Sequence, residues 1–211
     1  MRVQRRLLSL AASTFIVVLC PLASTGADDR ILIFSPLEGD ARIEFAYEAI
    51  AFWNETFEGL GLAPAFAEPR VISGSTKRRA LENYAWQISR RAGRPPAGPL
   101  QPPPPPELIG LEADVVVLLS VQGLMPFSWP LPELQRYFIA IHQPGSGSTK
   151  SDPRDVIAHE LGHAVGLEHN NDPSSLMCLP CGLPSAQARR ETFLPLTPAD
   201  RARLVELHSA Q

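Results

Sequence analysis

The sequence predicts an α+β domain, in which short apolar strands alternate with amphipathic helices. Apolar runs rich in β-branched residues, typical of buried strands, occur at residues 30–34 and 114–120. Apolar side chains recur with helical spacing in residues 40–61 and 77–92. The 211 residues are 45% hydrophobic, which is enough to bury the core of one domain.

The N-terminus has the features of a secretory signal. Three arginines precede an apolar run at residues 7–22, and small residues follow it. We therefore expect a signal peptide over residues 1–27 and a mature chain, 28–211, that is secreted, periplasmic or otherwise extracellular. A membrane anchor is the alternative, but the run is short and ends near Pro21. Lipidation of Cys20 is a further alternative, although its neighbours fit that signal poorly.

The first predicted strand, residues 30–34, is followed by a helix. Asp40 can cap this helix, and Gly59 or Gly61 can end it. The side chains expected on its buried face are Ile43, Tyr47, Ile50 and Phe57.

A second strand is expected within residues 65–73, where Pro69 restricts it to an edge or a bend. A helix then runs from about residue 77 to 92, and Gly93 follows it. Its apolar stripe consists of Leu81, Tyr84, Ala85 and Ile88. We expect its basic residues to form a solvated face with charged ends; they are Lys77, Arg78, Arg79, Arg90 and Arg91.

Residues 94–107 include eight prolines, five of them consecutive at residues 102–106. Such a run lacks backbone donors and should form a stiff polyproline II segment. It could link two domains, or it could bind a proline-recognising partner at residues 102–106. We expect a surface excursion from a single domain, 28–211, because residues 28–93 alone would make a poor core.

Residues 114–120 form the clearest strand and should lie centrally, because they are apolar on both faces. Residues 137–142 form another strand. The stretch between them, residues 121–135, contains several prolines and is expected to be irregular. Residues 145–151 are rich in glycine and serine and predict a loop.

Two further helices are predicted from their first residues. Asp152 can cap a helix that has Pro153 at its first position. Thr197 and Pro198 begin the last helix in the same way, and Asp200 completes a pattern that resembles a capping box.

The segment HELGHAVGLEH, residues 159–169, predicts a metal site. His159 and His163 are four residues apart on the predicted helix, so both imidazoles lie on one face and can bind one zinc ion. Glu160 is turned about 100° from His159, which suits a base better than a third ligand. A straight helix would turn His169 away, so it can be the third ligand only if Gly166 breaks the helix.

This segment resembles the zinc signature of the metzincin metallopeptidases, which also have a methionine turn, here at Met177. Residues 169–177, with Asp-Pro after the third histidine, resemble the matrixin branch, as do residues 196–200 and the aromatic-rich helix containing Trp53. The resemblance implies a metzincin-like, twisted mixed sheet of about four to five strands. Two long helices, a zinc-site helix, the Met-turn and a C-terminal helix would accompany the sheet.

The resemblance also implies a zinc metalloendopeptidase with one catalytic zinc ion and a metal-activated water. Glu160 would be the catalytic base, and Met177 would pack beneath the ligands His159, His163 and His169. An extended polypeptide substrate would lie along a sheet edge, expected within residues 121–128. The loop at residues 179–194 would wall the pocket beyond the scissile bond. The loops give no prediction for calcium.

Several features depart from the matrixin pattern. No propeptide with a cysteine switch is expected. Asn170 replaces a small hydroxyl residue, and Leu179 stands where some metzincins have a tyrosine near the metal. A second, structural zinc is not expected, because only His142 and His208 remain outside the cluster. His142 is instead expected to be a core or edge histidine.

Cys178 and Cys181 form the one CxxC pair that would remain after signal removal. In an oxidising compartment a short structural disulfide is expected. A redox dithiol and half of a zinc-thiolate site are the alternatives.

Two other functions remain open at this point. The chain could be a secreted zinc-binding interaction protein with a non-catalytic site, or a metal-dependent amidase that acts on a non-peptide substrate. The net charge of −3 does not favour a nucleic-acid partner, and no further segment is long and apolar enough to be a membrane span.

Overall fold

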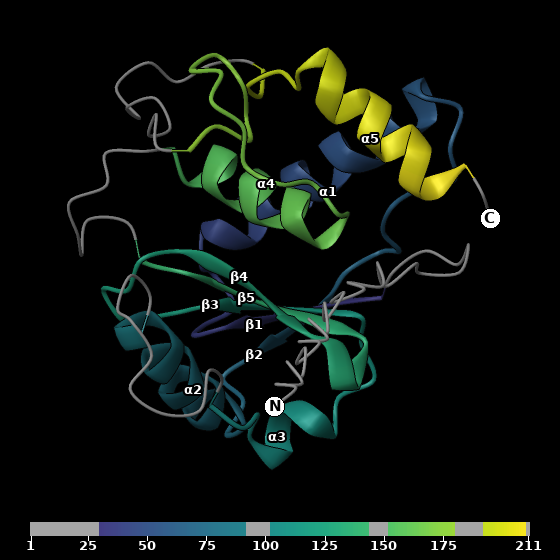
Figure 1. Ribbon diagram of the computed structural model, residues 1–211. Helices are drawn as coiled ribbons and strands as arrows, with labels where there is room; N and C mark the ends of the chain where they lie inside the picture. Colours follow the sequence, from purple (N-terminus) through teal and green to yellow (C-terminus); the bar gives the residue numbers. More distant parts are fainter. Residues whose placement is uncertain (1–29, 92–101, 144–151, 180–191, 210–211) are drawn as a thin grey trace, which may run out of the picture.

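A mixed sheet separates two groups of helices in the structure, a computed structural model that describes residues 30–91, 102–143, 152–179 and 192–209 (Figure 1). The five strands lie in the order β2-β1-β3-β5-β4. They are β1 (Ile31–Ser35), β2 (Arg70–Ser73), β3 (Val115–Leu119), β4 (Phe127–Leu131) and β5 (Arg136–Ile141). The helices are α1 (Arg42–Gly59), α2 (Arg78–Arg91), α3 (Pro106–Ile109), α4 (Pro153–Ala164) and α5 (Pro198–His208).

The sheet is parallel except at one edge. Strand β1 pairs in parallel with β2 and β3, and β3 pairs in parallel with β5. Strand β4 pairs with β5 in the antiparallel direction and forms one edge of the sheet. The predicted α+β fold class, with a mixed sheet of four to five strands, is therefore confirmed.

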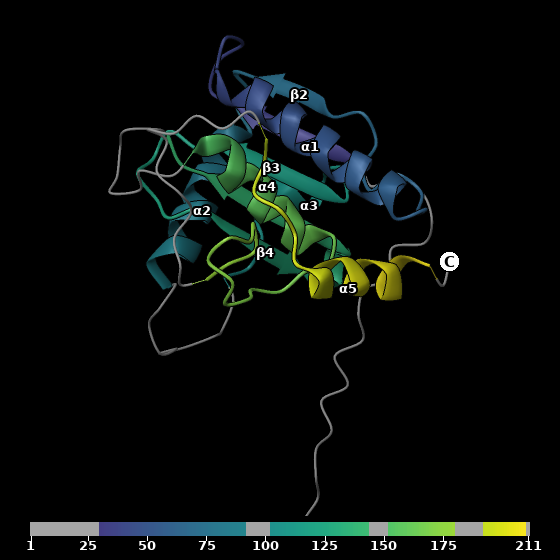
Figure 2. The same ribbon diagram turned by 90° about the horizontal axis from the view of Figure 1, so that it is seen from above.

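The helices cover both faces of this sheet. Helices α1, α4 and α5 lie on one side, and α2 and α3 lie on the other (Figure 1). Seen from above, α1 and α4 lie side by side, with α5 at one end (Figure 2). Strand β3 is central and all five of its residues are buried, because a strand with helices on both faces has no solvated side. The expected central strand is thus confirmed.

The other predicted strands and the second helix are also found. The run at residues 30–34 forms β1, and residues 137–142 largely form β5. Strand β2 begins directly after Pro69 and lies at an edge, as that proline requires. The helix expected from about residue 77 to 92 is α2, with the predicted apolar stripe buried.

The buried face of α1 differs from the predicted one. Ile50 and Phe57 are buried as expected, but Tyr47 is 43% exposed. The buried stripe runs instead through Ala46, Ala49 and Trp53. The small alanines let α1 approach α4 closely, so the contact face is set by the partner helix.

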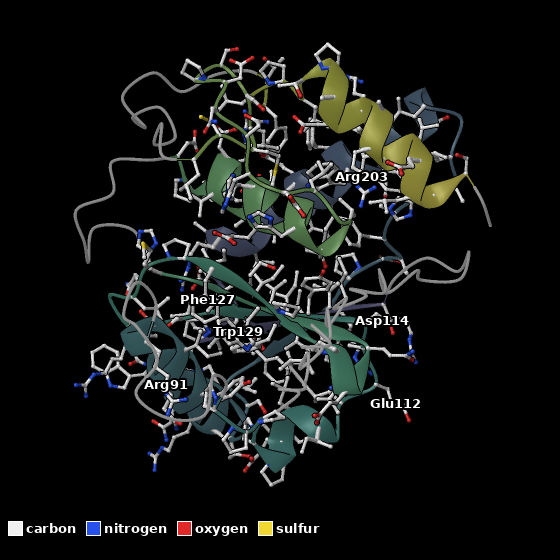
Figure 3. All side chains as sticks on the ribbon, viewed as in Figure 1. Arg91, Glu112, Asp114, Phe127, Trp129 and Arg203 are labelled. Carbon is white, nitrogen blue, oxygen red and sulfur yellow. The ribbon has the colours of Figure 1, made fainter. Side chains whose placement is uncertain are left out.

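The stretch expected to be irregular, residues 121–135, contains the edge strand β4 and a 3₁₀ turn. This expectation was wrong because an edge strand tolerates proline. Pro130 has no N–H to donate, but a strand with only one neighbour can accommodate it. Figure 3 shows Phe127 and Trp129 on this strand, beneath α4.

The described part of the proline run packs against α2. Pro102 is buried, and the Tyr84 hydroxyl donates to its carbonyl oxygen at 3.4 Å. Pro105 is extended, but Pro106 begins the short helix α3, so the run is not polyproline II throughout. Proline suits the first position of a helix, where the backbone N–H has no intrahelical partner. Residues 94–101 of the expected excursion lie outside the described residues.

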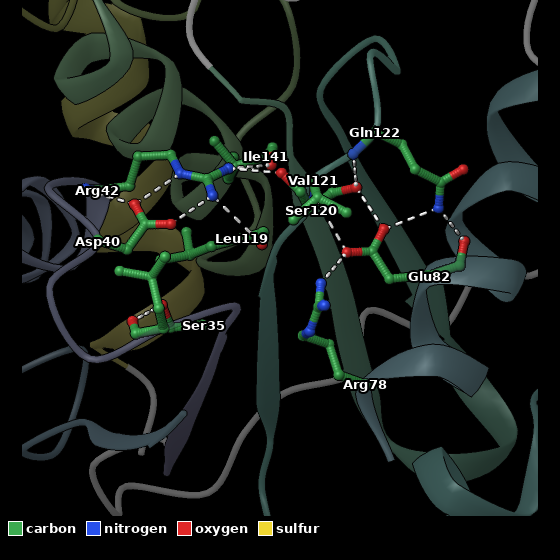
Figure 4. A network of polar contacts seen from close by, with 11 residues as sticks. Ser35, Asp40, Arg42, Arg78, Glu82, Leu119, Ser120, Val121, Gln122 and Ile141 are labelled. Carbon is green, nitrogen blue, oxygen red and sulfur yellow. Dashed lines mark hydrogen bonds and ion pairs between the residues drawn. The ribbon is translucent and has the colours of Figure 1, made fainter. Parts of the chain in front are cut away.

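Two buried charged groups fix α1 and α2 to the ends of β3 and β5 (Figure 4). The Arg42 guanidinium, 2% exposed, donates to the carbonyl oxygens of Ser120 and Ile141 at 2.7 and 3.1 Å. It also pairs with Asp40, whose carboxylate accepts the backbone N–H of Arg42. On the other side, Glu82 accepts from the Ser120 hydroxyl at 2.5 Å. A buried charge with a full set of partners holds its helix in one position.

No helix among the described residues is long and apolar enough to cross a membrane. The predicted signal peptide at residues 1–27, with Cys20, lies outside the described residues. The whole of the predicted Gly/Ser loop, residues 145–151, lies outside them as well.

Candidate metal centre

Helix α4 begins as the sequence predicts. The Asp152 side chain accepts the N–H of Arg154 at 3.0 Å, and Pro153 occupies the first helical position. The helix is held against α1 by Trp53, whose indole N–H donates to the Ala158 carbonyl oxygen at 2.9 Å. This hydrogen bond lies one residue before His159, so it fixes the part of α4 that carries the histidines.

Helix α4 ends just before Gly166, as it must if His169 is to approach the other two histidines. Gly166 has φ +91°, a left-handed conformation that glycine adopts without strain. The N–H of Leu167 donates to the Gly162 carbonyl oxygen, and that of Gly166 donates to the His163 carbonyl oxygen. This pair of bonds is the Schellman motif, which satisfies the last carbonyls of a helix. The predicted break at Gly166 is therefore confirmed, and the chain returns toward His163.

The break brings the three histidines together. The Nε2 atoms of His163 and His169 are 3.0 Å apart, and those of His159 and His169 are 3.2 Å apart. One ring nitrogen from each histidine lies within 4.8 Å of the other two, an arrangement that could hold a metal ion. His169 is exposed and His163 is half-buried, so the cluster opens to solvent.

The other ring nitrogens determine the tautomers. The Nδ1 of His159 is 2.7 Å from the Leu176 carbonyl oxygen, and the Nδ1 of His163 is 2.8 Å from that of Leu167. A carbonyl can only accept, so each Nδ1 carries the hydrogen and each Nε2 presents a lone pair. Burial lowers the pKa of both imidazoles, that of His163 to about 4, which favours the neutral form.

These donors fit zinc. Tetrahedral coordination with Zn–N bonds of 2.0–2.1 Å places ligand nitrogens about 3.3 Å apart, close to the separations found here. The Nε2 lone pairs of His159 and His163 both point toward Nε2 of His169, as expected for ligands that converge on one cation. Backbone carbonyls that orient the other ring nitrogen are typical of metal-binding histidines.

Glu160 lies next to the cluster and is 7% exposed. Burial raises the pKa of its carboxyl group to about 8. Within the described residues its side chain makes no hydrogen bond or ion pair. A nearby cation would therefore be the main factor that favours its ionised form.

Met177 lies directly beneath α4. It is fully buried, and a Cβ atom at Gly162 would lie 2.5 Å from its sulfur. The preceding residue, Leu176, supplies the carbonyl that orients His159. The turn that contains Met177 thus supports the first histidine from below. The sequence does not predict the contact at Gly162, since a glycine inside a helix does not reveal what it packs against.

The segment that carries the third histidine is joined to α5. Asn170 donates from its side chain to Ser175 Oγ and to Asp200 Oδ2, both at 3.0 Å. Asp200 also completes the predicted capping box with Thr197, which is confirmed. Asn170, which replaces the small hydroxyl residue of the matrixin pattern, thus has a structural role. That role depends on Asp200, which lies 30 positions later in the chain.

A second contact with α5 lies at the other end of this segment. His208 Nε2 is 3.0 Å from the Val165 carbonyl oxygen and therefore donates to it. The His208 ring also packs edge-on against Phe57, with ring centroids 4.9 Å apart.

His142 lies just beyond β5 and is partly buried, and burial lowers the pKa of its imidazole.

Cys178 follows Met177 and is buried. Its expected partner, Cys181, lies outside the described residues, so the disulfide stays a prediction. Most of the segment expected to wall the pocket, residues 180–191, also lies outside them. Leu179, the last described residue before it, is exposed.

A sequence model of the matrixin family matches residues 32–208 of this chain. The match begins at the second residue of β1 and ends with the last residue of α5, so it includes α4 and the Met177 turn. The matrixins are zinc-dependent metallopeptidases, and the three convergent histidines are consistent with that chemistry. The chain therefore belongs to the matrixin family of metallopeptidases.

Proposed function

We propose that this protein is a secreted zinc-dependent endopeptidase. In this proposal His159, His163 and His169 hold one zinc ion, and Glu160 is the general base. The main support for the proposal is the convergence of the three Nε2 atoms. In His159 and His163 the other ring nitrogen, Nδ1, already donates to a backbone carbonyl. Secretion rests on the signal-like segment at residues 1–27.

The three imidazoles are neutral ligands and leave the fourth position open. Zinc held in this way keeps its positive charge, so it would acidify a coordinated water and polarise the carbonyl of a peptide bond. The open position distinguishes a catalytic site from a structural one, which usually has four protein ligands. Within the described residues, the cluster contains three histidines and no fourth ligand.

Glu160 would accept the proton of the attacking water and then donate it to the leaving amine. Its burial keeps competing water away from the carboxyl group, and the cation would draw its pKa down from about 8. A carboxyl group whose pKa lies near neutrality can both accept and return a proton. No side chain would become covalently attached to the substrate.

An extended substrate would lie along the outer edge of β4. This strand forms the edge of the sheet that lies under α4, and among the described residues no strand pairs with its outer side, where a peptide could pair. The edge was expected within residues 121–128, but β4 begins only at Phe127. Pro130 can donate no hydrogen bond there, so a bound peptide would pair mainly with the remaining residues of the strand.

Peptide-library cleavage by the zinc-loaded protein tests the proposal. Glu160→Gln should abolish cleavage while zinc remains bound, because no histidine is changed. Glu168→Gln is the matched control, since Glu168 belongs to the same segment but is exposed and should not affect turnover. Cleavage by purified Glu160→Gln at the wild-type rate would contradict the general-base assignment.

The same assay separates the alternative functions. A zinc-binding interaction protein would contain zinc but would not cleave a denatured protein, with or without chelator. An amidase that acts on a non-peptide substrate would fail to cleave every peptide and would hydrolyse a simpler amide. Chelator-sensitive peptide cleavage supports the endopeptidase and excludes the other two.

A further inference from the structure

Helix α2 carries an exposed cationic face that the metal centre does not use. On an ideal helix, positions 79, 83, 86 and 90 fall within an arc of about 60°. The residues there are exposed; they are Arg79, Asn83, Trp86 and Arg90. Lys77, just before the helix, is exposed as well. The opposite face of α2 is apolar and packs on the sheet, so this arc faces away from the protein.

Among the residues that the structure describes, the positive charges of this face have no ion-pair partner. None of the ion pairs among the described residues involves Lys77, Arg79 or Arg90. The acid of this helix, Glu82, is buried and bound by Arg78 and by the end of β3. Since the whole chain has a net charge of −3, this face is a local concentration of positive charge.

Helix stability does not account for the cations at the start of α2. The first turn contains no acidic residue, although acids are favoured at that end of a helix dipole and cations such as Arg79 are disfavoured. Arg90 lies in the last turn, where the dipole favours a cation, so only the N-terminal cations weaken the isolated helix slightly. An external anion would reverse this effect.

Trp86 lies in the middle of the cationic face and is 46% exposed. The Arg90 guanidinium lies 5.9 Å from the centroid of its ring. An indole has an apolar body and one polar N–H, which suits the boundary between lipid headgroups and acyl chains. A tryptophan among arginines thus matches a surface that is both anionic and partly apolar.

We propose that this α2 face binds the surface of an anionic phospholipid bilayer. A helix surface is convex, so it can touch a plane along the roughly 16 Å between positions 79 and 90 but cannot enclose a soluble ligand. Helix α2 lies on the side of the sheet opposite α4 (Figure 1). Figure 3 shows Arg91 of α2 extending from that far side, away from Arg203 on α5. A protein bound through α2 would therefore keep the three histidines facing the solution.

Vesicle co-sedimentation tests this proposal. The purified protein should bind vesicles of phosphatidylcholine mixed equally with phosphatidylglycerol, more tightly than pure phosphatidylcholine vesicles, and added salt should weaken the binding. The double variant Arg79→Glu/Arg90→Glu should bind the anionic vesicles about 30-fold more weakly or worse. Trp86→Ala should also bind less and should lose the blue shift of tryptophan fluorescence seen with the wild type.

The matched control is Arg201→Glu/Arg203→Glu on α5, which changes the net charge equally and should bind like the wild type. All variants share one N-terminus, so any binding by residues 1–27 cancels in the comparison. Equal binding of neutral and anionic vesicles by the wild type contradicts the proposal, as does wild-type binding by the α2 double variant. Binding to dextran sulfate without binding to vesicles would also refute it and would indicate a soluble polyanion. Peptide cleavage in solution should be unchanged in the α2 variants, so this test is independent of the proposed peptidase activity.

Discussion

Gly162 and Met177 are in direct contact across the floor of the histidine cluster. A Cβ atom on residue 162 would lie 2.5 Å from the Met177 sulfur and 3.0 Å from Trp53. Such distances are far below a normal van der Waals contact, so no larger residue fits there without movement. The absence of a side chain at position 162 lets α4 sit directly on the Met177 turn. The same turn supplies the Leu176 carbonyl oxygen that orients the His159 ring.

Gly162→Ala should therefore destabilise the protein by about 1–3 kcal/mol, as expected for overpacking of a core. It should also weaken zinc binding, because α4 must move relative to Leu176. Gly59→Ala is the control, since a Cβ at the end of α1 meets nothing within 4 Å. Chemical denaturation and zinc competition titrations measure both effects. Equal stability and zinc affinity in the two variants would refute the proposed contact.

Gly166→Ala should be more harmful to metal binding than to folding. Its φ of +91° is strained for alanine, and a Cβ would lie 2.6 Å from Leu207. The strain should cost about 1–2 kcal/mol, and its relief should displace the segment that carries His169.

Gly61→Ala separates the two effects of the Gly166 substitution. Gly61 has a φ of +74°, but a Cβ there meets nothing within 4 Å, and it lies in the turn after α1. Gly61→Ala should lose about as much stability as Gly166→Ala and should keep the zinc affinity of the wild type. If both variants lose zinc affinity to the same extent, the role assigned to the Gly166 break is wrong.

The pH dependence of stability should report on Glu160. Its pKa is raised from 4.5 to about 8 in the folded, metal-free protein, so the folded state holds a proton that the unfolded state releases. The resulting stabilisation is complete below about pH 4.5 and is lost as the pH rises through 8. Metal-free Glu160→Gln should therefore gain stability relative to the wild type between pH 5 and 8. Zinc should reduce this difference, because the cation keeps the carboxylate ionised. A pH-independent difference between the two metal-free proteins would contradict the burial of Glu160.

Asp200→Ala should loosen the third histidine from a distance. It removes the cap of α5 and also one of the two acceptors of the Asn170 side chain, the one that joins it to α5. Thr197→Ala removes only the cap, so both variants should lose about 0.5–2 kcal/mol of stability. Only Asp200→Ala should also weaken zinc binding, by roughly tenfold or more. Equal zinc affinity in the two variants would show that the Asn170 contact does not position His169.

The features predicted from the sequence depend on near neighbours along the chain. The caps at Asp152 and Thr197 are formed by side chains and N–H groups two or three residues apart. The break at Gly166 follows from the conformational freedom of glycine and from the need to return His169. Such local chemistry can be read without knowledge of the fold.

The features that were missed depend on distant parts of the chain. Arg42 binds carbonyls 78 and 99 residues away, and the contact of Gly162 with Met177 joins a helix to a turn. Tyr47 was placed on the buried face of α1 because apolar spacing does not specify which arc meets the partner helix. Strand β4 was predicted only as a sheet edge within residues 121–128, because its prolines obscure the strand pattern and only its edge position makes them acceptable.

X-ray absorption at the zinc edge tests the central assignment most directly. We expect one zinc ion per chain, with three imidazole nitrogens at 2.0–2.1 Å and one further light atom. His169→Ala should reduce the imidazole count to two. A sulfur ligand in the wild-type spectrum, or an unchanged spectrum in His169→Ala, would contradict the three-histidine site.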